Sequence, residues 1–156
     1  MTEVRPVPAH LRTVTPRLVV GDGTAAIAFY ERCFGAELVG ERFDGPSGEL
    51  IHAELRIGDS VVMLTEDAAD GPIASPARVG NLVTCVMATY WQDVDQAWER
   101  AIKAGAEVVY PLADHFYGER GGRLRDPFGQ QWMMSRHIED VAPDELARRA
   151  AAYFEK

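Results

Sequence analysis

The sequence contains an internal repeat, and this repeat limits the possible folds more than any other feature. Residues 30–32 read Tyr-Glu-Arg and are followed by Gly-Ala-Glu-Leu-Val at 35–39. The same order returns as Trp-Glu-Arg at 98–100 and Gly-Ala-Glu-Val-Val at 105–109, with two extra residues between the blocks. A repeat of this kind indicates two copies of one supersecondary unit, because a single copy cannot bury its apolar face alone. The sequence therefore predicts two modules of the same architecture.

Each copy of the repeat contains one amphipathic helix with recognisable ends. In the first copy either Asp22 or Thr24 can cap the helix, and Gly35 can end it in a left-handed turn. In the second copy Asp93 begins the helix and Gly105 ends it. Apolar residues recur at helical spacing in both segments, which predicts one buried side for each helix.

Strand-like runs surround both helices in the same order. They are residues 17–20, 36–43, 50–57 and 60–65 in the first copy, then 81–90, 107–110 and a final hairpin around the turn Asp126-Pro127-Phe128-Gly129 in the second. Each copy therefore reads strand, helix, strand, strand, strand. We predict an α+β fold of two βαβββ repeats, with curved mixed sheets forming a cleft and an added C-terminal helix.

The boundaries of these parts follow from composition. We expect one compact domain that consists of an N-terminal arm (1–14), a first module (15–66), a linker loop (67–80), a second module (81–138) and a helical tail (139–156). The linker contains Asp, Gly, Pro and Ser without a period, as connecting segments do.

Charge and cysteine content narrow the cellular role. The 156 residues carry a formal net charge of −8, which argues against a nucleic-acid-binding surface or an anionic-membrane surface. No stretch is apolar enough to predict a signal peptide or a membrane span. Cys33 and Cys85 lie among apolar residues without metal-binding spacing, so we expect two packed, reduced thiols in a cytoplasmic protein.

Six segments resemble one known superfamily. Residues 116–132, FYGERGGRLRDPFGQQW, and residues 135–140 are similar to the last hairpin and tail of PhnB-like proteins, and residues 15–20, 25–30, 34–37 and 52–58 agree with the start of such proteins. PhnB-like proteins belong to the glyoxalase, bleomycin-resistance and extradiol-dioxygenase superfamily, also called vicinal oxygen chelate proteins. The resemblance covers about residues 15–140, and it implies the paired βαβββ fold more specifically than any one reaction.

The metal-ligand set of this superfamily is incomplete here. The resemblance implies a first ligand near Thr15, a third within residues 82–88 and a last one at Met133, and none of these positions offers a His, Gln or Glu. Only His52 and Glu54 remain as donors, and two ligands make a poor metal site. We therefore predict no four-ligand metal centre and no cofactor. A divalent metal at His52 and Glu54 is the alternative.

Other candidate site residues are aromatic or polar. His52 and Glu54 share one face of a strand and are the candidate catalytic pair; the alternative for Glu54 is a structural role, paired with an arginine. The candidate ligand-binding residues are Tyr90, Trp91, Tyr117, Arg120 and Trp132. Aromatic walls with a few convergent polar groups suit a small organic ligand. His10 lies in the arm, where we expect a solvated side chain.

These observations support two functions. The first is a small-molecule-binding protein of the bleomycin-resistance type. The alternative is an enzyme, a lyase, isomerase or dioxygenase-like protein acting on a small oxygen-rich or carbonyl substrate, with Glu54 or His52 as the acid or base and Arg120 steadying an oxyanion. A regulatory domain with a vestigial site is a third possibility. The resemblance also implies a homodimer.

Overall fold

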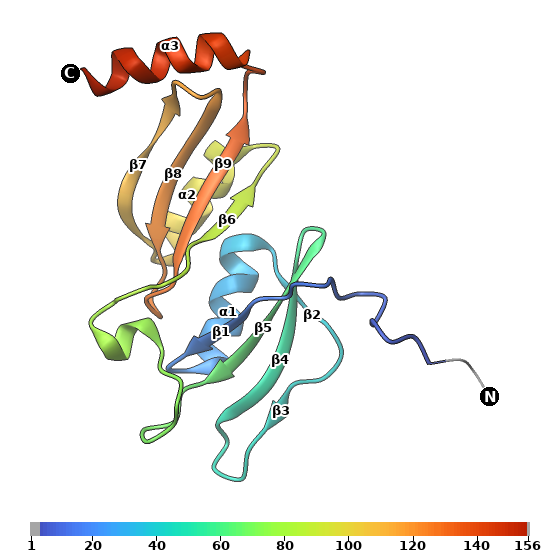
Figure 1. Cartoon of the computed structure of the whole chain (residues 1–156). Coiled ribbons are helices and arrows are strands. Elements are labelled where there is room, and N and C mark those ends of the chain that lie inside the picture. Colours follow the sequence, from blue (N-terminus) through green and yellow to red (C-terminus); the bar gives the residue numbers. More distant parts are fainter. Residues whose placement is uncertain (1–3, 156) are drawn as a thin grey trace. The chain divides into compact units, whose positions relative to one another are not determined.

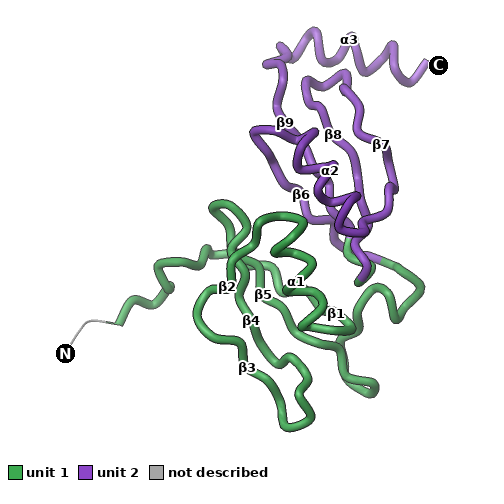
Figure 2. The backbone as a smooth tube through the Cα atoms, turned by 180° about the vertical axis from the view of Figure 1, so that it is seen from behind, with its two compact units in different colours: residues 1–82, 128–130 green, residues 83–127, 131–156 purple. Residues whose placement is uncertain are grey.

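The computed structural model describes residues 4–155 and divides them into two compact units (Figure 2). The first unit runs to Leu82 and also contains residues 128–130. The second unit consists of residues 83–127 and the chain after Gln130. Each unit has one mixed sheet and one βαβββ repeat, so the predicted α+β class is confirmed.

The first unit follows the predicted order of elements (Figure 1). Its elements are β1 (Arg17–Val20), α1 (Gly23–Phe34), β2 (Glu37–Leu38), β3 (Phe43–Asp44), β4 (Leu50–Ile57), β5 (Ser60–Glu66) and a 3-10 helix, η1 (Pro76–Val79). The sheet order is β1-β5-β4-β2, with β1 parallel to β5, while β3 pairs with β4. The single strand predicted over 36–43 is wrong. Gly40 has a φ of 70° there, and the strand is interrupted between β2 and β3.

The ends of α1 match the capping signals. The Asp22 side chain accepts a hydrogen bond from the Ala25 N–H at 2.8 Å, and Gly35 closes the helix with a φ of 64°. Between these ends, Phe29 and Tyr30 are buried. Their rings lie 6.0 and 6.1 Å from the ring of Phe128, measured between centroids. A residue from the turn after β8 therefore packs against the helix of the first unit.

The second unit has the same order of elements and one additional helix. Its elements are β6 (Met87–Tyr90), α2 (Val94–Ala104), β7 (Glu107–His115), β8 (Glu119–Arg125), β9 (Gln131–His137) and α3 (Pro143–Phe154). The sheet order is β6-β9-β8-β7, with β6 parallel to β9. The strand expected from residue 81 begins only at Met87, and the strand expected to end at Tyr110 continues to His115 because it pairs with β8.

The two faces of the second sheet are covered differently. Helix α2 lies on one face (Figure 1), where Gly122 leaves room for Trp98. A Cβ atom at Gly122 would lie 2.6 Å from the Trp98 ring. Successive residues of a strand point to opposite faces, so Arg123 faces away from α2. We call this second surface the open face. It carries Ala88 and Tyr90 on β6, Met133 and Ser135 on β9, Glu119, Gly121, Arg123 and Arg125 on β8, and Tyr110, Ala113 and His115 on β7.

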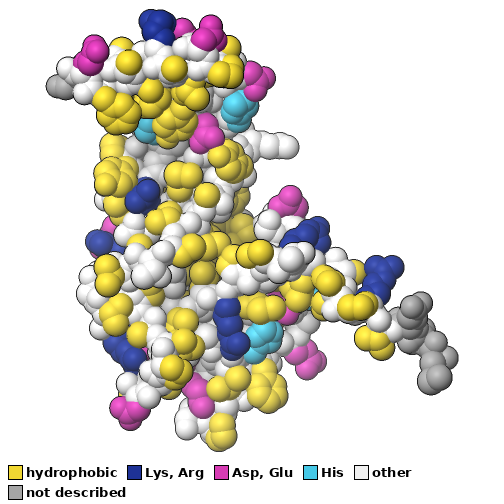
Figure 3. Space-filling view, in the orientation of Figure 1, with side chains coloured by type: hydrophobic (Ala, Val, Ile, Leu, Met, Phe, Trp, Pro, Cys, Tyr) yellow, Lys and Arg dark blue, Asp and Glu magenta, His cyan; other side chains and the backbone are white. Residues whose placement is uncertain are grey.

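Helix α3 contacts the turn between β7 and β8, and it has no buried residue of its own. The rings of Phe116 and Tyr153 lie 5.0 Å apart between centroids, and the Arg149 guanidinium binds Glu139 at 2.8 Å and Glu145 at 2.6 Å. Figure 3 shows hydrophobic side chains gathered on the side of α3 that meets this turn. Aromatic contacts and ion pairs thus hold α3 against the turn between β7 and β8.

Two further sequence predictions can be compared with the structure. Cys33 is buried, as expected for a packed thiol, whereas the prediction for Cys85 is wrong because its side chain is exposed. In the part of the chain from residue 4 to 155, no helix has the length and apolar character that crossing a membrane requires.

Candidate functional site

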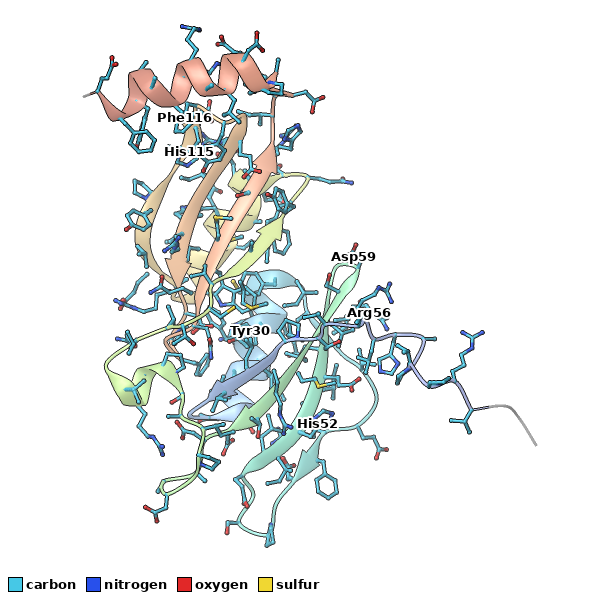
Figure 4. The ribbon with its side chains drawn as sticks, viewed as in Figure 1. Tyr30, His52, Arg56, Asp59, His115 and Phe116 are labelled. Atoms are coloured by element: carbon cyan, nitrogen blue, oxygen red, sulfur yellow. The ribbon has the colours of Figure 1, made fainter. Side chains whose placement is uncertain are left out.

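One cluster of ionisable side chains lies on the first sheet. His52, which Figure 4 labels, and Glu54 are two residues apart on β4, so they share the face opposite the buried Ala53 and Leu55. One Glu54 carboxylate oxygen lies 2.7 Å from His10 Nε2, and the other lies 3.5 Å from His52 Nε2. The expectation that His10 is merely solvated is therefore wrong. The arm places this imidazole against Glu54, which is only 15% exposed.

This cluster brings together groups that can transfer protons. Among residues 4–155, no three His, Cys, Asp or Glu side chains are arranged to hold a metal ion. The Glu54 carboxylate lies between the two imidazoles, and such a carboxylate can orient a neighbouring histidine or exchange a proton with it. This geometry suits acid–base chemistry at His52 and Glu54.

A second group of polar and aromatic side chains lies on the open face of the second sheet. The Tyr90 hydroxyl donates a hydrogen bond to a Glu119 carboxylate oxygen at 2.7 Å. This hydrogen bond, together with burial, raises the pKa of the Tyr90 phenol. Ser135, Gly121 and Ala113 are cross-strand neighbours with small or no side chains. Tyr90 is paired with Ser135 in the ladder and reaches across β9 to Glu119.

Arg123 stands out among the arginines of β8. Arg125 donates to Glu107, and Arg120 donates to Asp95 and Asp114. The Arg123 guanidinium has no carboxylate partner among the residues that the structure describes, and its Nε atom is buried without a hydrogen-bond acceptor. A buried donor left without an acceptor costs about 1–3 kcal/mol, so structures seldom contain one unless it has a purpose.

Tyr110 fixes the position of this guanidinium. The Arg123 Cζ atom lies 5.2 Å from the centroid of the Tyr110 ring, which is the geometry of a cation–π contact. The register between β7 and β8 shifts on both sides of Tyr110, between Val108 and Tyr110 and again before Ala113. Bulges of this kind redirect side chains and are frequent beside functional sites. The irregular strand thus brings Tyr110 opposite Arg123.

Two predicted ligand-binding residues lie on the other face of this sheet. Arg120 donates to Asp95 on α2 at 2.6 Å and to Asp114 on β7 at 2.9 Å. Trp132 is 1% exposed, and its indole N–H donates to Asp126 at 2.9 Å. Both side chains therefore have structural partners on the helix-covered face, which corrects the sequence-based placement of all the candidates on one surface.

The remaining two predicted ligand-binding residues lie near the edges of the sheet. The ring of Tyr117 stacks on that of His115, with centroids 5.0 Å apart, and burial raises the pKa of the Tyr117 phenol. Trp91 donates its indole N–H to the Thr89 hydroxyl at 2.8 Å. Of the five predicted ligand-binding residues, Tyr90 is therefore the one whose side chain lies on the open face itself.

The sequence reasoning missed Tyr110 and Arg123. A signal for Arg123 was present, because successive residues of a strand point to opposite faces of the sheet. Arg120 and Arg123 are an odd number of residues apart and so must lie on opposite faces. Tyr110 had no such signal, since the bulges around it break the two-residue period.

Comparison with known proteins agrees with the fold. Residues 9–134 match the family described as Glyoxalase/Bleomycin resistance protein/Dioxygenase superfamily. An uncharacterized protein of Mycobacterium bovis, Mb0911c, is 40% identical over 136 residues, which are 85% of this chain and 88% of that protein. The uncharacterized protein Rv0887c of Mycobacterium tuberculosis is also 40% identical over 136 residues, 85% of this chain and 79% of its own length.

Solved structures with a similar fold include TioX from Micromonospora sp. ML1. It is 26% identical with a TM-score of 0.60, and the match covers 84% of this chain and all of TioX. The PhnB protein from Bacillus cereus, titled a putative 3-demethylubiquinone-9 3-methyltransferase, is 17% identical with a TM-score of 0.61, covering 80% and 99% of the two chains. The fosfomycin resistance protein FosX from Listeria monocytogenes is 17% identical with a TM-score of 0.60, covering 86% and 97%. The last two similarities concern the fold alone.

Proposed function

This chain belongs to the glyoxalase/bleomycin resistance protein/dioxygenase superfamily, and on that premise we propose that it is a small-molecule-binding protein whose ligand lies on the open face of the second sheet. The observation that carries the proposal is the pair of aromatic side chains on that face. Tyr90 is 61% exposed and Tyr110 is 60% exposed. Large aromatic side chains held on a rigid sheet with polar neighbours are typical of sites for organic ligands.

The ligand surface differs from the set expected from the sequence. It keeps Tyr90 and adds Tyr110, Met133 and Arg123, which are neighbours across three strands. It leaves out Arg120 and Trp132, because both contact partners on the helix side. Binding on this surface needs no metal ion.

A fragment screen followed by nuclear magnetic resonance tests this function. Aromatic compounds are added to protein carrying ¹³C-labelled methionine methyl groups, and the Met133 methyl signal reports binding at the open face. We expect a subset of compounds to shift that signal in a saturable way. Replacing Tyr110 by Ala should weaken their binding about fivefold or more, since aromatic contacts contribute roughly 0.5–1.5 kcal/mol beyond the area they bury.

The matched control is Tyr153→Ala. Tyr153 is 60% exposed, like Tyr110, but lies on α3. This substitution should leave the affinities unchanged. A screen in which no compound shifts the Met133 signal, or in which both substitutions weaken binding equally, would contradict a ligand site on the open face.

An enzymatic role is the second candidate, and the cluster at Glu54 favours it. A carboxylate held 2.7 Å from one imidazole and 3.5 Å from another could remove a proton next to a carbonyl group. Loss of the α-protons of dihydroxyacetone in D₂O, followed by proton resonance, measures this reaction. Acceleration by the wild type that Glu54→Gln abolishes would establish catalysis. Stoichiometric metal in protein purified without chelator, lost in His52→Ala, would instead establish a metal at His52.

We also propose that the protein forms a homodimer, as the resemblance to the superfamily implies. Phe154 at the end of α3 is 78% exposed, and α3 has no buried residue within one chain. A second chain could cover this aromatic end. Sedimentation velocity at micromolar concentration measures the state, and a single monomeric species across that range would exclude the dimer.

A further inference from the structure

Arg123 is half-buried, and its guanidinium has no carboxylate partner among residues 4–155. Its Nε atom is buried and has no acceptor among the described residues, although the neighbouring arginines of the same strand all bind carboxylates. Two nearby carboxylates are already engaged: Glu119 on this face accepts from Tyr90, and Glu107, the cross-strand neighbour of Arg125, accepts from Arg125. Residues 4–155 therefore supply no anion for Arg123.

The contact with Tyr110 limits how a partner can approach. The guanidinium lies 5.2 Å from the Tyr110 ring centroid, so the ring occupies one side of the cation. The Nε atom itself is buried, so what remains for a ligand is the outer edge of the planar group, where the two Nη atoms present N–H donors side by side. Two oxygens in one plane match this fork, which is the geometry of a carboxylate.

The surroundings of the guanidinium are apolar. Met133 is the cross-strand neighbour of Arg123 on β9, Ala88 is the neighbour of Met133 on β6, and Tyr110 faces Arg123 on β7. A simple inorganic anion would make no contact with these side chains. An aromatic or other apolar body attached to the anionic group would cover them and exclude water from the ion pair.

We propose that Arg123 is the anion anchor of the open face and that the ligand is a small aromatic carboxylate, bound by its two oxygens to the two Nη donors of Arg123. This inference rests on the proposed ligand site, and it adds the chemical class of the ligand. Met133 and Tyr110 hold the apolar body, and Tyr110 also orients the guanidinium.

Matched ligands test the charge requirement. The affinities of 1-naphthoate and its uncharged amide are measured from the ¹³C methyl signal of Met133, and 1-naphthylphosphonate serves as a tetrahedral anion of the same body. With wild-type protein we expect naphthoate to bind at least about tenfold more tightly than the amide, since charge-assisted bidentate hydrogen bonds are roughly twice as strong as neutral ones.

Three variants separate anchoring from general electrostatics. Arg123→Gln should remove the preference for naphthoate, while Arg123→Lys should keep only a small part of it, because a lysine has no planar fork. Arg125→Gln removes a positive charge from the same face and strand but should leave the preference intact, because Arg125 is already paired with Glu107. Melting temperatures of all variants show that each is folded.

The outcomes distinguish this inference from the function on which it rests. Equal affinities for naphthoate and its amide, or an undiminished preference in Arg123→Gln, would overturn the anchor and leave the aromatic ligand site standing. Tighter binding of the phosphonate than of naphthoate would overturn the carboxylate class. If no aromatic compound of any charge shifts the Met133 signal, both the site and the anchor are refuted.

Discussion

In the first unit, residues 128–130, which come from far along the chain, complete the core beneath helix α1. The second unit is built from residues 83–127 and the residues after Gln130. Phe128 packs on Phe29 and Tyr30, and the Gln130 side chain donates to the Val19 carbonyl oxygen at 2.9 Å. In the second unit, the close approach of Trp98 to Gly122 joins helix and sheet. A repeat of sequence therefore does not imply that both copies complete their cores alike.

The sheet faces opposite the helices differ as well. On the first sheet, the acid Glu54 already lies against the imidazoles of His10 and His52. On the second sheet, the cation Arg123 has no counter-charge among the described residues. A charged side chain that is paired with another group of the protein can contribute to stability or to proton transfer. A charged side chain without such a partner can bind a ligand. This difference is a further reason, beside the exposed aromatic pair, for proposing a ligand on the second sheet.

The largest expected effect concerns Phe128, in the turn that belongs to the first unit. Phe128→Ala should destabilise the first unit by about 2–3 kcal/mol, below the roughly 3–5 kcal/mol for a fully buried phenylalanine because Phe128 is half-buried. Urea denaturation measures the change. Phe43→Ala is the control, since Phe43 is 66% exposed in the same unit and its loss should cost no more than about 0.5 kcal/mol. Equal losses in the free energy of unfolding of the two variants would show that the first unit does not depend on the turn.

A smaller effect concerns the acid stability of α3. The hydrogen bonds and charges of Arg148 and Arg149 lower the pKa of Glu145 to about 2, from its usual 4.5. Because the folded pKa is depressed, this stabilisation is complete above pH 4.5 and is lost as the pH falls towards 2. The proton resonances of Phe116 and Tyr153 should therefore keep the chemical shifts that their ring contact causes at pH 4 and lose them between pH 4 and 2.

The control for α3 is Glu145→Gln. The variant keeps the aromatic contact between Phe116 and Tyr153 but has no carboxylate at position 145. Its resonances should change less steeply over the same pH range, with Glu139 as the remaining acid bound to Arg149. Identical acid transitions in the two proteins would show that the ion pairs do not hold this helix.

The smallest effect concerns the titration of a single phenol on the open face. The hydrogen bond from Tyr90 to Glu119 raises the pKa of Tyr90 above its usual 10. The raised pKa favours the folded state up to pH 10, and this contribution is lost as the pH rises through the folded value. Glu119→Gln should lower the pKa of Tyr90 towards 10, as measured by phenolate absorbance at alkaline pH. Tyr90→Phe identifies the signal, and an unchanged titration in Glu119→Gln would mean that the hydrogen bond does not form in solution.

The sequence alone determined the repeat, the two capped helices and the βαβββ order, because caps, turns and helical spacing are local signals. Asp22, Gly35, Asp93 and Gly105 each act at the helix end that their position predicts. The alternation along β4 also placed His52 and Glu54 on one face. Local geometry dictates all of these features within a few residues.

Only the tertiary structure decided which charged groups have partners. Arg120 and Arg123 lie three residues apart on one strand, yet Arg120 binds Asp95 on α2 and Arg123 has no acidic partner within residues 4–155. The pairing of His10 with Glu54 likewise joins residues 44 positions apart. Such contacts depend on where distant segments pack and on bulges that alter strand register. For that reason the spacing of residues along the sequence could identify candidates for the site but could not select among them.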